Sequence, residues 1–256
     1  YFIHHLIDEV YHDLLTSTAV NFFINANLLG WKKQEETRNK YNCNVPWAII
    51  MDPTSACNLH CTGCWAAEYG NRYNLSFDDM DSIIQQGKDM GVYFFMYTGG
   101  EPMIRKKDLI KLAEKHDDCA FLCFTNGTLI DEEFASDMLR VKNFIPAISL
   151  EGFKEATDIR RGEGTFDKVV DAMKLMRKYK LLYGISCCYT SQNYKSIISE
   201  EYYDFLVELG ADFIWLFHYM PVGNDADLSL LLTPDQREEL YHRTRELRWT
   251  KPMFTM

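Results

Sequence analysis

The sequence predicts an α/β fold in which helices cover a parallel sheet. From residue 46 onward, short runs rich in aromatic and β-branched residues alternate with stretches whose apolar residues recur at helical spacing. Six such runs with five intervening helices form a βα repeat, and parallel strands need helical crossovers of this kind. The strands are almost continuously apolar, as expected when both faces of a sheet are covered. This pattern leaves two architectures open: an open doubly wound sheet, or a closed or partly closed barrel.

The predicted elements follow one another in a regular order. Strands are expected at 46–52, 92–98, 119–126, 143–150, 181–189 and 212–220. Helices are expected between them at 76–90, 106–117, 131–140, 165–179 and 199–210. Ser76, followed three residues later by Asp79, resembles a capping box at the start of the first of these helices. Gly91 and Gly210 stand where glycines commonly end a helix.

The two ends of the chain differ from this repeat. Residues 1–44 show helical periodicity and no strand pattern, which predicts a helical segment packed against the rest. A helix lying on a membrane surface is the alternative, but its polar face is not rich in lysine or arginine. We expect a core domain at 45–225, and at 226–256 a helix with the start of a C-terminal extension. We interpret the chain as a fragment of a longer protein, cut at both ends.

Composition excludes several classes of protein. The 256 residues carry a formal net charge of −10, which argues against nucleic-acid binding through broad phosphate neutralisation. No run of about 18 apolar residues exists, so we expect no membrane span. Of the eight cysteines, all but Cys43 lie in one cluster or in strand-like apolar runs. This distribution fits the reducing cytoplasm better than the disulfide pairing of secreted proteins.

Three cysteines lie close together just after the first predicted strand. Cys57, Cys61 and Cys64 form a CxxxCxxC pattern at the carboxyl end of that strand, where parallel βα folds assemble their chemistry. The spacing suits an iron–sulfur cubane held by cysteine thiolates, with one coordination position left for another ligand. A structural zinc site would normally show a second ligand pair further along the chain. Cys43 and His60 remain alternative fourth ligands for a site held entirely by the protein.

A glycine-rich turn follows the second predicted strand. Residues Thr98 to Pro102 read TGGEP. Gly99 and Gly100 would let the backbone approach a ligand closely, and Glu101 offers a carboxylate to an ammonium group. Alone, this turn could be an ordinary βα loop. Its position one βα unit after a three-cysteine loop makes the combination much more specific.

The CxxxCxxC loop after the first strand and GGEP after the second together resemble the radical S-adenosylmethionine (radical SAM) superfamily. The resemblance covers about residues 46–223. It implies that family's partial (β/α)6 TIM-like barrel, here with an N-terminal helical prefix. It also implies that Cys57, Cys61 and Cys64 bind a 4Fe–4S cluster whose unique iron is chelated by S-adenosylmethionine.

The resemblance further implies contacts to the bound S-adenosylmethionine. The residues that would make them are Gly99, Gly100, Glu101, Pro102, Ser149 and Arg161. The first three would hold the methionyl amino group. Ser149 begins an SLEG stretch after the fourth strand, where the family often places polar contacts, as it does at TNGT (125–128) after the third. Arg161 lies in IRRGEGTF, which resembles an arginine-containing stretch of relatives with peptide or cofactor-precursor substrates; a solvated residue at a helix start is the alternative.

One position departs from the family pattern. The residue before the third cysteine is often aromatic in this family and touches the adenine, but here it is Gly63. Trp65 would cover that surface instead, with a packed loop aromatic as the alternative. His218 and Tyr219 alternate at the end of the last predicted strand, so one of them is expected to face the barrel interior. The backbone of 218–223 would contact the adenine by resemblance.

The resemblance implies an enzyme that reductively cleaves S-adenosylmethionine at the cluster, giving a 5′-deoxyadenosyl radical that acts on a substrate. Reduced ferredoxin or flavodoxin would supply the electron, and residues acting on the substrate stay unassigned. A peptide or cofactor precursor is the favoured substrate. Relatives with this layout often carry a SPASM-like C-terminal extension, and they modify peptides or build cofactors. A lipid or isoprenoid substrate is the alternative. A non-catalytic zinc or iron–sulfur protein is the competing class, but it would need a fourth protein ligand and would have no use for GGEP.

Overall fold

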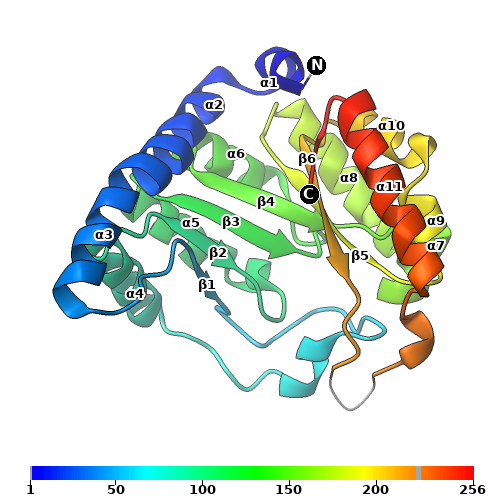
Figure 1. Ribbon diagram of the computed structural model, residues 1–256, viewed down its shortest axis with the longest axis horizontal. Helices are drawn as coiled ribbons and strands as arrows, with labels where there is room; N and C mark the ends of the chain where they lie inside the picture. The colour runs from blue at the N-terminus through cyan, green and yellow to red at the C-terminus, as the bar shows by residue number, and fades with distance from the viewer. Residues whose placement is uncertain (1, 223–225) are drawn as a thin grey trace.

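The computed structural model describes residues 2–222 and 226–256 and contains a seven-stranded sheet (Figure 1). All six neighbouring pairs are parallel, and the strands follow their order in the sequence. The strands are β1 (Ile49–Met51), β2 (Phe94–Tyr97), β3 (Ala120–Thr125), β4 (Phe144–Ser149), β5 (Gly184–Tyr189), β6 (Phe213–His218) and β7 (Phe254–Thr255). Among the described strands, β1 and β7 each pair with one neighbour, so the sheet curves without closing. The predicted partial barrel is confirmed, and a short seventh strand is added to it.

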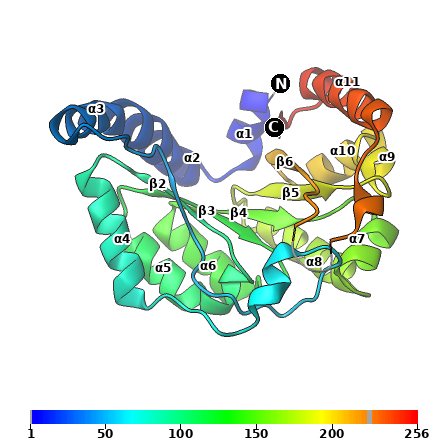
Figure 2. The same cartoon turned by 60° about the horizontal axis from the view of Figure 1, so that its bottom comes forward.

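Helices between the strands cover the convex face of the sheet (Figure 2). The five predicted crossover helices all form: α4 (Phe77–Asp89), α5 (Lys106–Lys115), α6 (Glu132–Val141), α8 (Thr165–Lys178) and α10 (Glu200–Glu208). The predicted capping box of α4 is present, since the side chains of Ser76 and Asp79 each accept from the other's backbone N–H. Five further short elements were not predicted: η2 (Trp65–Tyr69), η3 (Pro102–Arg105), α7 (Lys154–Arg161), α9 (Tyr194–Ile197) and η4 (Leu228–Leu230).

The N-terminal segment is helical, as predicted. It consists of α1 (Phe2–Glu9), α2 (His12–Thr18), the π-helix η1 (Ala19–Leu29) and α3 (Gly30–Tyr41). Two buried side-chain amides of this segment donate hydrogen bonds to backbone carbonyls just before β3 and β2. Asn21 Nδ2 donates to Asp117 O (2.8 Å), and Gln34 Nε2 donates to Gly91 O (2.9 Å). These helices therefore pack at the amino end of the sheet and leave its carboxyl edge open. No described helix is long and apolar enough to cross a membrane.

The C-terminal segment returns to the sheet. The helix α11 (Pro234–Thr250) begins at a capping box formed by Thr233 and Gln236. It leads into β7, which pairs with β6. The expected boundaries at 44 and 225 remain a prediction, and residues 223–225 lie outside the described part of the chain.

The two faces of the sheet bury different side chains. The convex face carries the main core, in which Tyr97 and Phe121 stack with ring centroids 5.7 Å apart and planes 3° apart. The concave face carries a smaller cluster, and near its carboxyl edge Phe124, Trp215 and Phe217 lie within 5.4–5.6 Å of one another. The alternation of side chains along each strand separates these two sets. The concave face therefore presents a partly exposed aromatic surface beside the carboxyl edge.

A buried carboxyl group at the start of β6 makes the stability of this fold depend on pH. Asp212 Oδ2 accepts from Tyr183 N–H (3.2 Å), and its other oxygen has no partner. Burial raises the pKa of Asp212 to about 8, the hydrogen bond from Tyr183 opposes this shift, and the charge of Glu9 adds to it. The folded chain therefore keeps this proton over a pH range in which the unfolded chain has already lost it.

We expect the free energy of unfolding to fall by about 1.4 kcal/mol per pH unit between about pH 4 and pH 8 through this one group. The contribution is complete below the unfolded pKa and is lost as the pH rises through the folded one. Asp212→Asn removes the titration, so urea unfolding across this range should show a flatter profile. The exposed Asp171→Asn serves as the control. An unchanged slope in Asp212→Asn would contradict the assignment.

Candidate functional site

The loop that follows β1 carries the three clustered cysteines. Cys57, Cys61 and Cys64 are half-buried free thiols at the carboxyl edge of the sheet. Burial raises the pKa of the Cys57 and Cys61 thiols, and the neighbouring Cys64 raises both further. The charge of Arg161 opposes these shifts. The thiols of Cys57 and Cys61 therefore lie within reach of the same two neighbours, Cys64 and Arg161.

The donor set fits an iron–sulfur cluster. Soft thiolates are the protein ligands that such clusters take, and three of them converge on one loop. Within residues 2–222 and 226–256, no three His, Cys, Asp or Glu side chains already lie close enough to hold a metal ion. A cubane takes each of its thiolates at a different iron, so the lack of a single-ion site does not bear on it.

The GGEP turn after β2 packs directly onto the cysteine loop. Gly100 N–H donates to Thr54 O (3.0 Å) and Glu101 N–H to Ala56 O (2.7 Å). A Cβ atom at Gly100 would lie 2.2 Å from the carbonyl oxygen of Ala56, and one at Gly99 would lie 2.8 Å from that of Thr54. The sequence predicts that these glycines allow close approach of a ligand. In the structure, the backbone that approaches them is that of the cysteine loop.

The carboxylate of Glu101 is buried and turned toward the end of β3. It accepts hydrogen bonds from Thr125 Oγ1 (2.7 Å), Asn126 N (2.7 Å) and Met103 N (2.9 Å). Burial raises the pKa of Glu101, and these three donors counter part of the rise. The side chain thus joins the GGEP turn to the TNGT stretch. Its contact with a methionyl amino group remains a prediction.

The TNGT stretch also reaches the cysteine loop. Asn126 Nδ2 donates to Asn58 Oδ1 (2.8 Å), and Asn58 Nδ2 donates to Thr128 Oγ1 (2.9 Å). Asn58 directly follows the first cysteine. The family resemblance predicts polar contacts to the cofactor here, and the structure adds hydrogen bonds that anchor the loop.

A buried cluster of charges lies on the other side of the loop. Glu151 is fully buried and accepts from Arg160 Nη1 (2.7 Å) and from Arg161 through both Nη2 (2.6 Å) and Nε. Burial acts to raise the pKa of Glu151, but the charges of Arg161 and Arg160 outweigh it and hold the pKa below its ordinary value. Two arginines share one carboxylate, so the cluster carries a net positive charge.

This charged cluster contacts the cysteine loop at two points. Thr62 N–H donates to the backbone carbonyl of Arg160 (2.8 Å), and Arg161 Nη1 lies 3.8 Å from Cys61 Sγ. The alternative of a solvated Arg161 at a helix start is wrong, because Arg161 is a nearly buried residue at the end of α7. A positive charge beside a cysteine favours its thiolate form.

The remaining predicted site residues also lie at the carboxyl edge. Ser149 is the last residue of β4, half-buried on the concave face and in register with Ser186 of β5. Pro102 begins η3 and is buried. His218 is the last residue of β6, and its ring lies 4.6 Å from that of Tyr189. Their contacts with a cofactor remain predictions.

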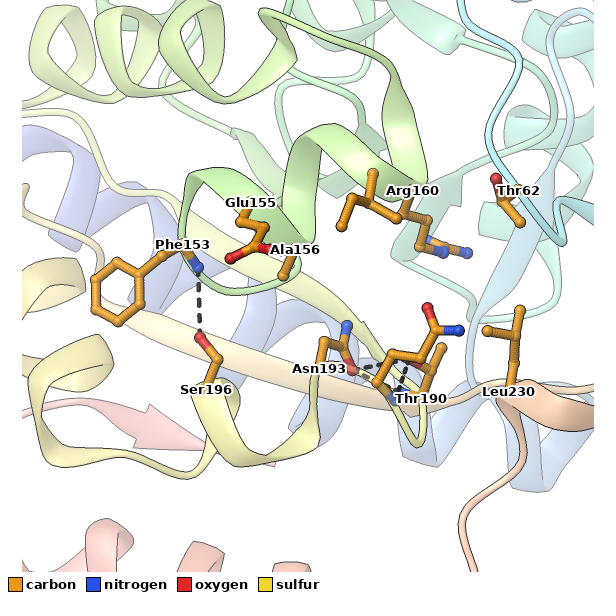
Figure 3. Close-up of a pocket in the computed structure, with 11 residues that line it drawn as sticks. Thr62, Phe153, Glu155, Ala156, Arg160, Thr190, Asn193, Ser196 and Leu230 are labelled. Atoms are coloured by element: carbon orange, nitrogen blue, oxygen red, sulfur yellow. Dashed lines mark hydrogen bonds between the residues drawn. The ribbon is translucent and has the colours of Figure 1, made fainter.

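A cavity of about 380 Å³ borders this edge (Figure 3). Thr62 and Arg160 lie at one end of it, and Phe153 lies at the other. Its wall includes Asn193, whose Nδ2 donates to the carbonyl of Cys188 (3.1 Å). The sequence does not predict this cavity, because its lining comes from α7, α9 and loops that lack a hydrophobic period.

Comparison with known proteins decides the family. The model of the radical SAM superfamily matches residues 51–198, which is more than half of the chain. The chain belongs to the radical SAM superfamily. The matched range contains the cysteine loop, the GGEP turn and the Glu151 cluster.

Several members of this superfamily are similar to the chain. Fe-coproporphyrin III synthase of Methanosarcina barkeri is 29% identical over 211 residues, covering 78% of this chain and 52% of that protein. The cysteine-type anaerobic sulfatase-maturating enzyme of Clostridium perfringens is 30% identical over 173 residues, covering 59% of this chain and 46% of that protein. The chain spans about half the length of these curated relatives.

Solved structures show the same fold. Streptococcus suis SuiB bound to S-adenosylmethionine superposes with a TM-score of 0.74 at 21% identity, covering 90% of this chain and 54% of that one. The C-terminal β7 and the N-terminal helices lie outside the range matched by the superfamily model. The structural similarity thus extends over 90% of the chain, whereas the superfamily model matches only residues 51–198.

The buried cluster around Glu151 predicts a large loss of stability when its carboxylate is neutralised. Glu151→Gln leaves two buried guanidinium groups without a counter-charge, which should lower the free energy of unfolding by about 3–5 kcal/mol. Chemical denaturation at neutral pH measures this. Glu132→Gln is the matched control, since Glu132 pairs with Lys178 on the surface and its loss should matter far less. Equal effects of the two substitutions would contradict the buried-charge account.

Proposed function

We propose that this radical SAM protein is an enzyme that binds a 4Fe–4S cluster through Cys57, Cys61 and Cys64 and takes S-adenosylmethionine at the remaining iron. The observation that carries the proposal is the direct packing of the GGEP turn onto the three-cysteine loop. Together the bound groups would supply reductive cleavage of S-adenosylmethionine, with hydrogen abstraction from a substrate giving 5′-deoxyadenosine.

The chain's own residues would orient these groups. Gly99 and Gly100 sit where their backbone reaches the cysteine loop, and we assign them, with the carboxylate of Glu101, to the methionyl amino group. Ser149 and Arg161 would complete the polar contacts. The positive charge of Arg161 would stabilise the thiolate of Cys61 and could also pair with the carboxylate of bound S-adenosylmethionine.

A peptide or a cofactor precursor is the substrate class that we favour. Relatives of both kinds are similar to this chain, among them the sulfatase-maturating enzyme and Fe-coproporphyrin III synthase. The concave face supports this choice, because Phe124, Trp215 and Phe217 offer a partly exposed aromatic surface beside the carboxyl edge. We further propose reduced ferredoxin or flavodoxin as the electron donor and the reducing cytoplasm as the location.

Anaerobic reconstitution tests the ligand assignment. We expect about four iron atoms and four sulfides per chain, as a cubane requires. Cys61→Ala should lose most of this iron, whereas Cys43→Ser should keep it, because Cys43 is exposed and lies outside the loop. Iron and sulfide analysis gives the result. An intact cluster in Cys61→Ala, or zinc in place of iron, would overturn the assignment and favour a non-catalytic metal protein.

Cleavage of S-adenosylmethionine tests the reaction. With dithionite as reductant, the reconstituted protein should release 5′-deoxyadenosine, and adding S-adenosylmethionine should change the EPR spectrum of the reduced cluster. Arg161→Gln should weaken this spectral response at a given concentration of S-adenosylmethionine while iron content is retained. A loaded cluster that shows neither the spectral change nor 5′-deoxyadenosine would refute the enzymatic proposal.

A further inference from the structure

The turn between the second and third cysteines is held by two distant parts of the chain. Cys64 N–H donates to Cys61 O (3.1 Å), which closes a β-turn, and Gly63 within it has a φ of 68°. Thr62 N–H donates to the carbonyl of Arg160 at the end of α7. The second contact comes from the residue that directly follows β6.

The ring of Tyr219 occupies the space beside Gly63. A Cβ atom built on Gly63 would lie 2.6 Å from Cε2 of Tyr219 and 3.1 Å from both Cζ and the hydroxyl oxygen. No side chain fits at position 63 while this ring is in place. Two independent reasons therefore favour glycine at position 63: its left-handed φ, and the Tyr219 ring, which leaves no room for a Cβ atom.

Tyr219 is itself firmly held. It is only 5% exposed, and its N–H donates to Tyr189 O (3.2 Å), which extends the pairing of β5 with β6 by one residue. Its hydroxyl accepts from Asp227 N–H (3.0 Å). By contrast, Trp65 is 46% exposed and packs edge-on against Tyr69. The aromatic ring that contacts the cysteine turn thus comes from the end of β6.

We propose that Tyr219 is a positioning residue for the cysteine loop. Its ring and the carbonyl of Arg160 hold the turn that separates Cys61 from Cys64, so that β6 and α7 set the spacing of two candidate cluster ligands. This inference rests on the proposed function, in which those thiols bind a cluster. A loop held in this way keeps two ligands in place while the cluster is oxidised, reduced or exposed to a competing chelator.

A double-mutant cycle tests the contact. Tyr219→Leu removes the two ring carbons and the hydroxyl oxygen that block position 63. It should raise the rate at which a chelator extracts iron from the reconstituted protein about tenfold, equivalent to ~1.4 kcal/mol. Gly63→Ala should raise this rate in the wild-type chain. It should raise it much less in Tyr219→Leu, because the clash is gone and only the cost of the left-handed φ remains. Tyr219→Phe keeps the ring and should restore most of the resistance.

The control separates positioning from stability. Tyr203→Leu also truncates a fully buried tyrosine, in α10, and should lower the thermal midpoint without accelerating iron loss at a temperature where the chain stays folded. Strictly additive effects of Gly63→Ala and Tyr219→Leu, or equal iron loss in Tyr203→Leu and Tyr219→Leu, would overturn the proposal. If wild-type protein takes up no iron, the proposed function fails instead. Alkylation rates of Cys61 and Cys64 across the same cycle would then decide whether Tyr219 holds the turn.

Discussion

Parallel pairing of consecutive strands is the constraint on which the rest of this molecule depends. Because each strand lies beside the next one in sequence, every loop that leaves a carboxyl end emerges at the same edge. The cysteine loop, the GGEP turn and the TNGT stretch come from β1, β2 and β3 in turn. Their mutual hydrogen bonds follow from that proximity. The N-terminal helices reinforce the arrangement by covering the opposite edge.

Two buried carboxylates convert this proximity into a fixed geometry. Glu101 joins the loops after β2 and β3, and Glu151 holds the two arginines of α7 against the cysteine loop. Each is paired with several donors, which is how a buried charge becomes tolerable. The two carboxyl groups differ in the direction of their pKa shift. The pKa of Glu101 is raised by burial, whereas that of Glu151 is lowered by its two arginines. The site therefore combines a buried carboxyl group near β2 with a cationic side near α7.

Much of this architecture follows from patterns that a sequence displays openly. The six strands and five crossover helices have strong apolar periodicity, and the cysteines and GGEP have distinctive spacing. The missed features lack such signals. Helix α7 buries only Thr157, so it shows no apolar face, and the pairing of Glu151 with arginines nine and ten residues later depends on how that helix docks. The ring beside Gly63 comes from a residue far along the chain, which local sequence does not reveal.

The anchoring of the cysteine turn has a consequence for the order in which the molecule matures. Arg160 and Tyr219 both leave the ribosome after the three cysteines, and Tyr219 is the later of the two. The roughly 150 residues that separate Tyr219 from Cys64 take on the order of 15 s to synthesise at ~10 residues per second. Throughout that interval the loop lacks at least one of its two anchors. A cluster delivered early would bind to a flexible loop, whereas a cluster delivered late would bind to a loop whose turn is already held in place. Assembly machinery that waits for the sixth strand would therefore encounter the chain in its receptive form.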